Sequence, residues 1–301
     1  MTVAESYDTA FSQWLEGAWA KKPELRSVSV EGARVSYRAW NLDDKEKPGL
    51  LLTHGYIGHG GWWDHIAPHF LDKYRVIAPD LTGMGDSEWR PEYSREQYGR
   101  EFLAVARDAG LDRVVIACHS YSSISALWAT HLAPDLIERV IVIDALVFEI
   151  PQRDVMITTT RRYPDMESML GRYKLMPPGR WPLPQVLDYV ARRSCRLTDE
   201  GDWTWKFDPT IMQAAIGNPL SEKMNGMHLP VDYIYGEHSE IATEAVRNRF
   251  LAGMPGCGQM VAIPLSHHHV MIEQPVGLIA ALKGVLAQPH PLSESPSRTR
   301  P

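Results

Sequence analysis

The pattern of apolar and polar residues along the chain predicts strands that alternate with helices. Residues 26–30 and 35–40 alternate apolar and polar positions on either side of Glu31-Gly32, which predicts a β-hairpin. Helical periodicity is found at 96–109 and 122–131. Aliphatic runs bounded by turn residues are typical of strands buried on both faces of a parallel sheet, and they occur at 49–53, 75–78, 114–117 and 140–143. The alternation predicts an α/β fold with helices on both faces of the sheet.

The pattern changes after Asp144. Residues 148–224 contain no clean strand run and are rich in Arg, Met, Pro and Trp, which predicts an inserted, mainly helical cap. Strand periodicity returns at 231–235 and again at 260–263. The chain therefore leaves the sheet once and comes back to it.

The domain organisation follows from this break. Residues 1–147 and 225–287 are expected to form the two parts of one core domain. Within the first part, the first thirty residues predict a short helix that lies on the body. Residues 288–301 are rich in Pro and Ser and are expected to be a disordered tail.

Composition narrows the class of partner. The chain has 301 residues, 44% of them hydrophobic, and a formal net charge of −6, which allows a sizeable core and argues against nucleic acid as the main partner. No apolar run approaches the roughly 18 residues of a membrane span, and no secretion signal opens the chain. The odd set of Cys118, Cys195 and Cys257 fits neither a zinc site nor a disulfide framework. Reduced thiols in the cytoplasm are the expectation.

The candidate chemistry begins where the predicted strand 114–117 runs into the helix that starts near Ser122. A sharp turn between a buried strand and a helix places one side chain in a strained backbone conformation at the end of the sheet. Ser120 occupies that position, and its flanking residues Cys118 and Ser122 are small enough for a close approach of strand and helix. Ser120 is therefore the candidate nucleophile, with a chance serine in an ordinary strand–turn–helix as the alternative.

A second strand end supplies the candidate oxyanion hole. The strand 49–53 ends in His54-Gly55-Tyr56, where the glycine allows a tight turn. The N–H of Tyr56 is expected to converge with the N–H of Tyr121 on one developing negative charge. His54 itself is expected to hold its loop by hydrogen bonds.

These segments, in their order and spacing, resemble the α/β-hydrolase superfamily. The resemblance rests on His54-Gly55, on the tight loop with Asp80, Gly83 and Gly85, and on His119-Ser120-x-Ser122. It covers most of the chain outside the cap and the tail. It implies a mostly parallel eight-stranded sheet with helices on both faces, an inserted helical cap and hydrolase activity. The serine nucleophile disfavours dehalogenase and epoxide-hydrolase chemistry, which in this family use an aspartate there.

The resemblance also implies the general base. In the family's closing motif the catalytic histidine lies five residues before the glutamate of Glu-x-Pro, and counting back from Glu273 selects His268. A histidine with a pKa near neutral can take the serine proton and return it to the leaving group. Because His267, His268 and His269 are consecutive, they cannot easily face one ion, so no metal site is expected. Acyl transfer through a serine needs no cofactor, and none is expected.

The acid of the triad is the open question. The family places an aspartate after the penultimate strand, but Ser239 holds that position here. Asp144, at the end of strand 140–143, is the preferred replacement, because haloalkane dehalogenases place the acid there. Glu240 is the alternative acid, and a third possibility is that no carboxylate serves.

We therefore expect an esterase-like serine hydrolase that acts on a small apolar substrate through an acyl-enzyme. Trp62, Trp63 and His119 are expected to line the substrate pocket, together with Met and Trp side chains of the cap. Hydrolysis of a carbon–carbon bond in a ring-cleavage product would use the same residues. The alternative from another class is a ligand-binding relative without turnover. The sequence leaves the oligomeric state open.

Overall fold

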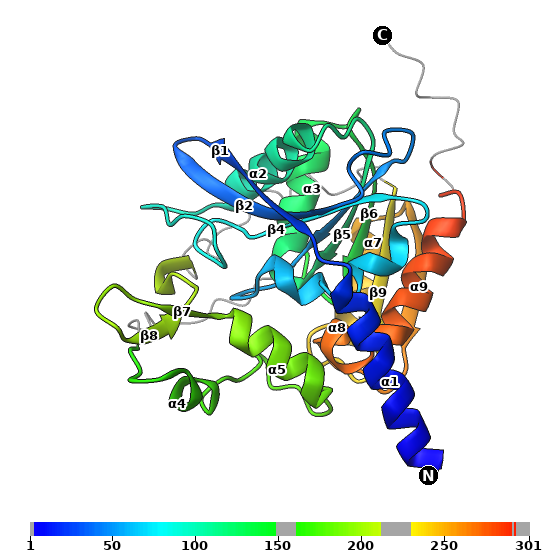
Figure 1. Ribbon diagram of the computed structural model, residues 1–301. Coiled ribbons are helices and arrows are strands. Elements are labelled where there is room, and N and C mark those ends of the chain that lie inside the picture. Colours follow the sequence, from blue (N-terminus) through cyan, green and yellow to red (C-terminus); the bar gives the residue numbers. More distant parts are fainter. Residues whose placement is uncertain (1–2, 149–160, 212–229, 291, 293–301) are drawn as a thin grey trace.

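An eight-stranded sheet forms the centre of the computed structural model, which describes residues 3–148, 161–211, 230–290 and 292. The strand order is β1-β2-β4-β3-β5-β6-β9-β10 (Figure 1). β2 pairs antiparallel with β1 and β4, and every other pair is parallel, so the expected fold class is confirmed. The strands are β1 (Glu24–Val30), β2 (Ala33–Trp40), β3 (Gly49–Thr53), β4 (Arg75–Pro79), β5 (Val114–His119), β6 (Ile137–Ile143), β9 (Val231–Gly236) and β10 (Cys257–Ile263).

The predicted hairpin is β1–β2. Its register ends at the pair Val30↔Ala33. The two residues between them have positive φ angles, 49° at Glu31 and 82° at Gly32. Two positive φ angles are what a two-residue turn needs to match the twist of the flanking strands.

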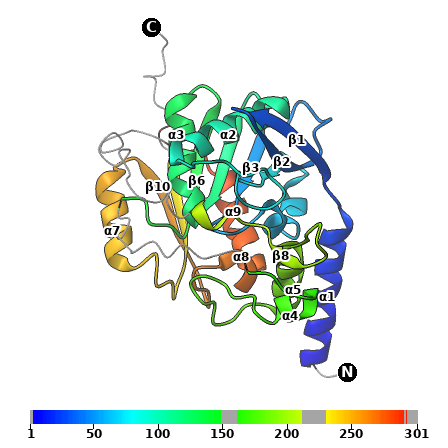
Figure 2. The ribbon, with the colours of Figure 1, turned by 90° about the vertical axis from the view of Figure 1, so that its left-hand side faces the viewer.

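The central strands are buried on both faces, which explains their continuous apolar runs. Along β3, Leu51 faces one hydrophobic cluster, while Leu50 and Leu52 face the other. The first cluster is covered by α2 (Arg95–Asp108) and α3 (Ser123–Leu132). The second is covered by short helices and by the C-terminal helix, namely η1 (Gly60–Trp63), η2 (Ala67–Phe70), α8 (Val270–Glu273) and α9 (Pro275–Ala287). Helix α7 (Glu244–Gly253) lies at the β10 edge of the sheet (Figure 2).

The N-terminal helix α1 (Val3–Ala20) is longer than the short helix that the sequence predicted. Leu15 and Ala18 bury its inner face, and Trp19 stacks on Tyr189 with ring centroids 4.4 Å apart. Both views show its N-terminal end extending away from the body (Figures 1 and 2). Among the described residues, no helix combines the length and apolar character that crossing a membrane requires.

The segment between β6 and β9 is described for residues 161–211. It holds two helices and an antiparallel hairpin, and it lies at the opposite end of the molecule from α3 (Figures 1 and 2). Strands of three residues are too short to leave a periodic pattern, so the sequence did not reveal this hairpin. The elements are α4 (Met166–Leu170), α5 (Pro184–Arg193), β7 (Cys195–Leu197) and β8 (Trp203–Trp205).

Parts of two predicted regions lie outside the described residues, namely 149–160 and 212–224 of the cap and most of the tail. The described start of the tail is packed rather than loose. Arg139 donates a hydrogen bond to the Gln288 carbonyl oxygen at 2.8 Å, and the His290 side chain is buried. A buried guanidinium that needs acceptors therefore holds this part of the chain.

Candidate active site

Ser120 lies at the turn where β5 ends and the helical turn η3 (Ser120–Ser122) leads into α3. Its φ angle is 52°, which is sparsely populated by residues other than glycine. The flanking Cys118 is fully buried, and burial raises the pKa of its thiol to about 12, so the thiol remains protonated. Ser122 bonds Thr53 across the sheet, with 2.6 Å between the hydroxyl oxygens. The small neighbours allow the close approach that strains Ser120.

The loop after β3 approaches this turn closely. A Cβ atom added at Gly55 would lie 3.3 Å from the Ser120 Cβ and 2.7 Å from His119 Nδ1, so only glycine fits without displacement. His54 holds the loop: its Nε2 accepts from the Leu81 N–H at 3.1 Å and its Nδ1 donates to the Gly55 carbonyl oxygen at 2.8 Å. The structural role expected for His54 is confirmed.

Tyr56 and Tyr121 come together beside Ser120. Their ring centroids lie 5.7 Å apart. Tyr121 is the second residue of η3, where a backbone N–H has no partner within the helix. The positive end of α3 adds to the field at this point. The Tyr121 N–H and the start of α3 can therefore stabilise negative charge next to Ser120.

His268 and Asp144 form a buried pair. Asp144 follows β6 with a φ angle of 48°, and its Oδ1 lies 2.7 Å from His268 Nδ1. Because the carboxylate only accepts, Nδ1 carries the proton and Nε2 presents a lone pair, which is the form that a general base requires. The Asp144 side chain is 0% exposed and the His268 side chain is 5% exposed, so water does not compete for this bond.

The alternative acid lies elsewhere. Glu240 is exposed and pairs with Arg180 across 3.4 Å at the surface. Ser239, in the position where the family has an aspartate, instead bonds Asp144. The structure thus brings Asp144, and not Glu240, to His268.

Glu273 explains why the histidine of the closing motif lies five residues before the glutamate. This buried carboxylate accepts from the His267 N–H and, at 3.2 Å, from the Arg180 N–H. It therefore holds the loop that presents His268, a role that sequence comparison alone did not assign. Among the described residues, no cluster of His, Cys, Asp or Glu is placed to hold a metal ion.

His119 holds the same loop from the other side. Its Nε2–H donates to the His268 carbonyl oxygen at 2.9 Å. Burial, together with repulsion from His268 and His269, places the pKa of His119 well below its ordinary value, so the ring is neutral. The Trp62 ring lies 6.3 Å from that of His119, whereas Trp63 is fully buried in the cluster of the second sheet face.

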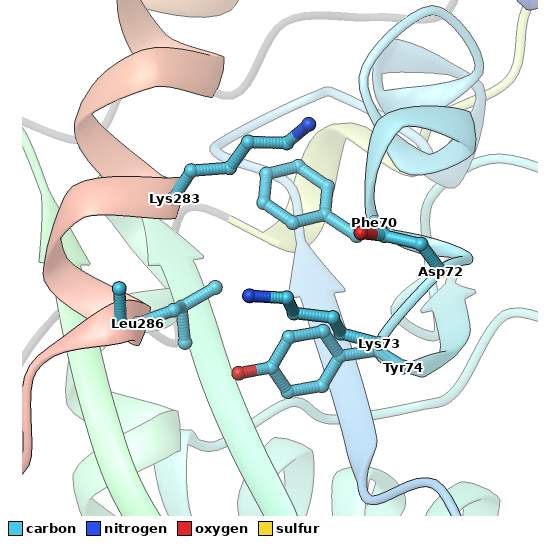
Figure 3. A pocket seen from close by; sticks show the side chains of 7 residues that line it. Phe70, Asp72, Lys73, Tyr74, Lys283 and Leu286 are labelled. Carbon is cyan, nitrogen blue, oxygen red and sulfur yellow. The ribbon is translucent and has the colours of Figure 1, made fainter.

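A cavity of about 100 Å³ lies apart from these residues (Figure 3). Its walls come from the end of η2, the loop before β4 and helix α9. None of the candidate active-site residues lines it. The candidate residues Ser120 and His268 therefore lie apart from this cavity.

The fold and the turn at Ser120 are those of α/β-fold hydrolases, and the comparison with known proteins agrees. A model of the alpha/beta hydrolase family matches residues 50–282, so the chain belongs to this family.

Two curated relatives and one solved structure illustrate the likeness. Lipase LipV of Mycobacterium tuberculosis is 26% identical over 202 residues, 65% of this chain and 68% of its own. A karrikin insensitive 2 receptor of Petunia hybrida is 29% identical over 103 residues, 32% of this chain and 37% of its own. An esterase from Mycobacterium tuberculosis superposes with a TM-score of 0.71 at 23% identity, over 92% of this chain and 96% of that one. The first curated relatives are covered over only 35% of their length.

Proposed function

We propose that the protein is a serine hydrolase that cleaves an ester or a related carbonyl compound through an acyl-enzyme. Ser120 is the nucleophile, His268 the general base and Asp144 the acid of the triad. The observation that carries this proposal is the buried bond of 2.7 Å between His268 Nδ1 and Asp144 Oδ1, in a loop that His119 ties to the strained Ser120 turn.

Each step follows from these roles. The Ser120 oxygen bonds to the carbonyl carbon while its proton passes to His268 Nε2, and the leaving alcohol departs with that proton. The N–H groups of Tyr56 and Tyr121 hold the oxyanion, and each such donor lowers the activation barrier by a few kcal/mol. Water then gives a proton to His268 and attacks the acyl group, and the returning proton restores the Ser120 hydroxyl.

In this proposal the substrate reaches Ser120 beneath the described part of the cap, residues 161–211. Trp62 and His119 belong to the apolar wall of its pocket in this proposal, whereas the fully buried Trp63 packs against the sheet. Such a wall favours a small acyl group with a largely apolar chain. The free cysteines support a reducing, cytoplasmic location.

A fluorophosphonate probe tests the proposal directly. The wild-type protein should gain one adduct mass on a peptide containing Ser120. Ser120→Ala should abolish both labelling and ester turnover while the circular dichroism spectrum stays unchanged. Ser27→Ala, at an exposed strand position, is the matched control and should label normally.

The second candidate is ligand binding without turnover, since one relative is named a receptor. An unlabelled wild-type protein that hydrolyses no aryl ester of two to eight acyl carbons would favour it and overturn the hydrolase proposal.

A further inference from the structure

Arg95 is a buried cation without a carboxylate partner among the described residues. It is 8% exposed, and no ion pair joins it to an acid of residues 3–148, 161–211 or 230–290. The other arginines of similar burial differ in this respect, because each lies within 4 Å of a carboxylate; they are Arg38, Arg75, Arg90 and Arg139. A buried charge costs several kcal/mol unless it is paired, so an unpaired one at this depth requires a reason.

The guanidinium lies against Tyr121, the residue after the proposed nucleophile. Its Cζ is 3.4 Å from the centre of the Tyr121 ring, and its Nη1 donates to the Tyr121 carbonyl oxygen at 2.5 Å. The same ring contacts Tyr56, which follows the neighbouring parallel strand β3 at the same edge of the sheet. One aromatic side chain therefore separates Arg95 from the proposed oxyanion hole.

The guanidinium has donors left to offer. Within the described part of the chain, Nε is buried and has no hydrogen-bond partner. Nη1 is the guanidinium nitrogen with a described acceptor, the Tyr121 carbonyl oxygen. Five N–H donors in a fixed plane suit a carboxylate, and here only Nη1 is used within the described part of the chain.

The surrounding field is positive as well. Arg95 is the first residue of α2, and its bond to Tyr121 places it at the start of α3. Helix N-termini carry partial positive charge, so both helices disfavour a cation and favour an anion here. Burial lowers the pKa of Arg95, and the nearest opposing influences are the phenols of Tyr121 and Tyr98 rather than a carboxylate.

We propose that Arg95 binds a carboxylate carried by the acyl part of the substrate, so that the enzyme acts on half-esters of dicarboxylic acids or their close analogues. The inference rests on the proposed hydrolase function and names its substrate class. It was not evident from sequence, where an arginine after the helix cap Ser94 has the pattern of a solvated surface residue.

Two esters with the same six-carbon acyl chain test the proposal: mono-4-nitrophenyl adipate, which ends in a carboxylate, and 4-nitrophenyl hexanoate, which ends in a methyl group. The wild-type enzyme should show a kcat/KM about tenfold or more higher for the adipate ester, since a hydrogen bond to a charged group contributes about 1.5–3 kcal/mol. Arg95→Gln should lower kcat/KM for the adipate ester about 30-fold or more, mainly through KM, because one partner of a desolvated pair is lost. The hexanoate value should change less than about threefold, because this ester has no anion to lose.

Two further variants complete the design. Arg95→Lys keeps the charge without the planar fork and should retain part of the preference. Arg172→Gln removes an exposed arginine and should leave both esters unchanged. If Arg95→Gln does not fold, the wild-type preference and Arg95→Lys still decide the question.

The outcomes separate the two proposals. Equal rates of the wild-type enzyme on both esters, or an equal loss on both in Arg95→Gln, would overturn the carboxylate site while leaving the hydrolase intact. If neither ester is hydrolysed, the hydrolase proposal fails, and calorimetric titration with adipate decides on Arg95 alone. Binding that Arg95→Gln abolishes would support the site, and no binding to the wild-type protein would refute it.

Discussion

The Ser239 hydroxyl donates a hydrogen bond to Asp144, with 2.6 Å between Oγ and Oδ1. The direction of this bond follows from its neighbours, because Ser239 Oγ accepts from the N–H groups of Ile241 and Ala242 and has a single proton to give. The same Oδ1 also accepts a hydrogen bond from the Nδ1–H of His268. The serine in the family's aspartate position therefore supports a carboxylate that comes from the neighbouring strand.

Replacement of Ser239 by alanine should lower the turnover of an aryl ester about tenfold. The carboxylate loses one charge-assisted hydrogen bond, worth about 1.5–3 kcal/mol, and with it part of its orientation toward His268. Ser239→Thr keeps the hydroxyl and should stay within about threefold of wild type. Equal kcat for wild type and Ser239→Ala would show that Ser239 does not position Asp144.

The two candidate acids should respond very differently to loss of charge. Asp144→Asn should lower kcat about 10³–10⁴-fold, because an amide cannot hold His268 in the tautomer that leaves Nε2 free to accept. Glu240→Gln removes an exposed partner of Arg180 and should leave kcat within about twofold, as expected for a surface pair. A larger loss in Glu240→Gln than in Asp144→Asn would reverse the assignment.

Alanine substitutions at Gly85 and Gly110 can be compared for their effect on stability, because the two φ angles are similar, 60° and 67°. A methyl group at Gly110 meets nothing within 4 Å, so Gly110→Ala should cost only the backbone strain of about 1–2 kcal/mol. A methyl group at Gly85 would overlap the carboxylate of Asp80. Asp80 cannot yield, because it accepts from the N–H groups of Gly60 and Asp86 at 2.6 and 2.7 Å.

Gly85→Ala should therefore cost about 3 kcal/mol or more of unfolding free energy, since overpacking adds about 1–3 kcal/mol to the strain. Urea unfolding of both variants measures the difference. Equal midpoints and slopes for Gly85→Ala and Gly110→Ala would contradict a rigid Asp80.

Buried neutral histidines should make the protein acid-sensitive. Burial lowers the pKa of His65 to about 4 and that of His269 to about 3, whereas both return to about 6.5 on unfolding. Below pH 6.5 the unfolded chain binds protons that the folded one does not, so stability falls as the pH falls toward 4. Each histidine should contribute about 1.4 kcal/mol per pH unit in this window.

His65→Gln isolates one of these contributions. Its unfolding free energy should fall about 1.6 kcal/mol less than that of wild type between pH 6.5 and pH 5, because one proton-binding difference is gone. The comparison cancels the carboxylates that titrate in the same range. Urea unfolding at both pH values is the measurement, and identical pH slopes would show that His65 is protonated while folded.

The local pattern of apolar and polar residues determined the central strands and the candidate nucleophile. Continuous aliphatic runs are diagnostic because strands buried on both faces leave no polar positions, and all four runs became central strands. The nucleophile candidate was also visible, since Ser120 stands between a strand and a helix with small neighbours. The spacing of His268 before Glu273 came from the resemblance, and the Glu273 bond to the His267 N–H is its physical cause.

The tertiary structure decided the questions that depend on which strands are neighbours. Asp144 and Ser239 are 95 residues apart, and they meet because β6 and β9 pair in the sheet. Nothing local to either residue records that pairing, so sequence left Asp144 and Glu240 both open. The same holds for Arg95, whose burial against Tyr121 follows from the packing of α2 on α3. Hydrophobic periodicity is a property of each segment alone, whereas the partner of a buried charge is a property of the assembled fold.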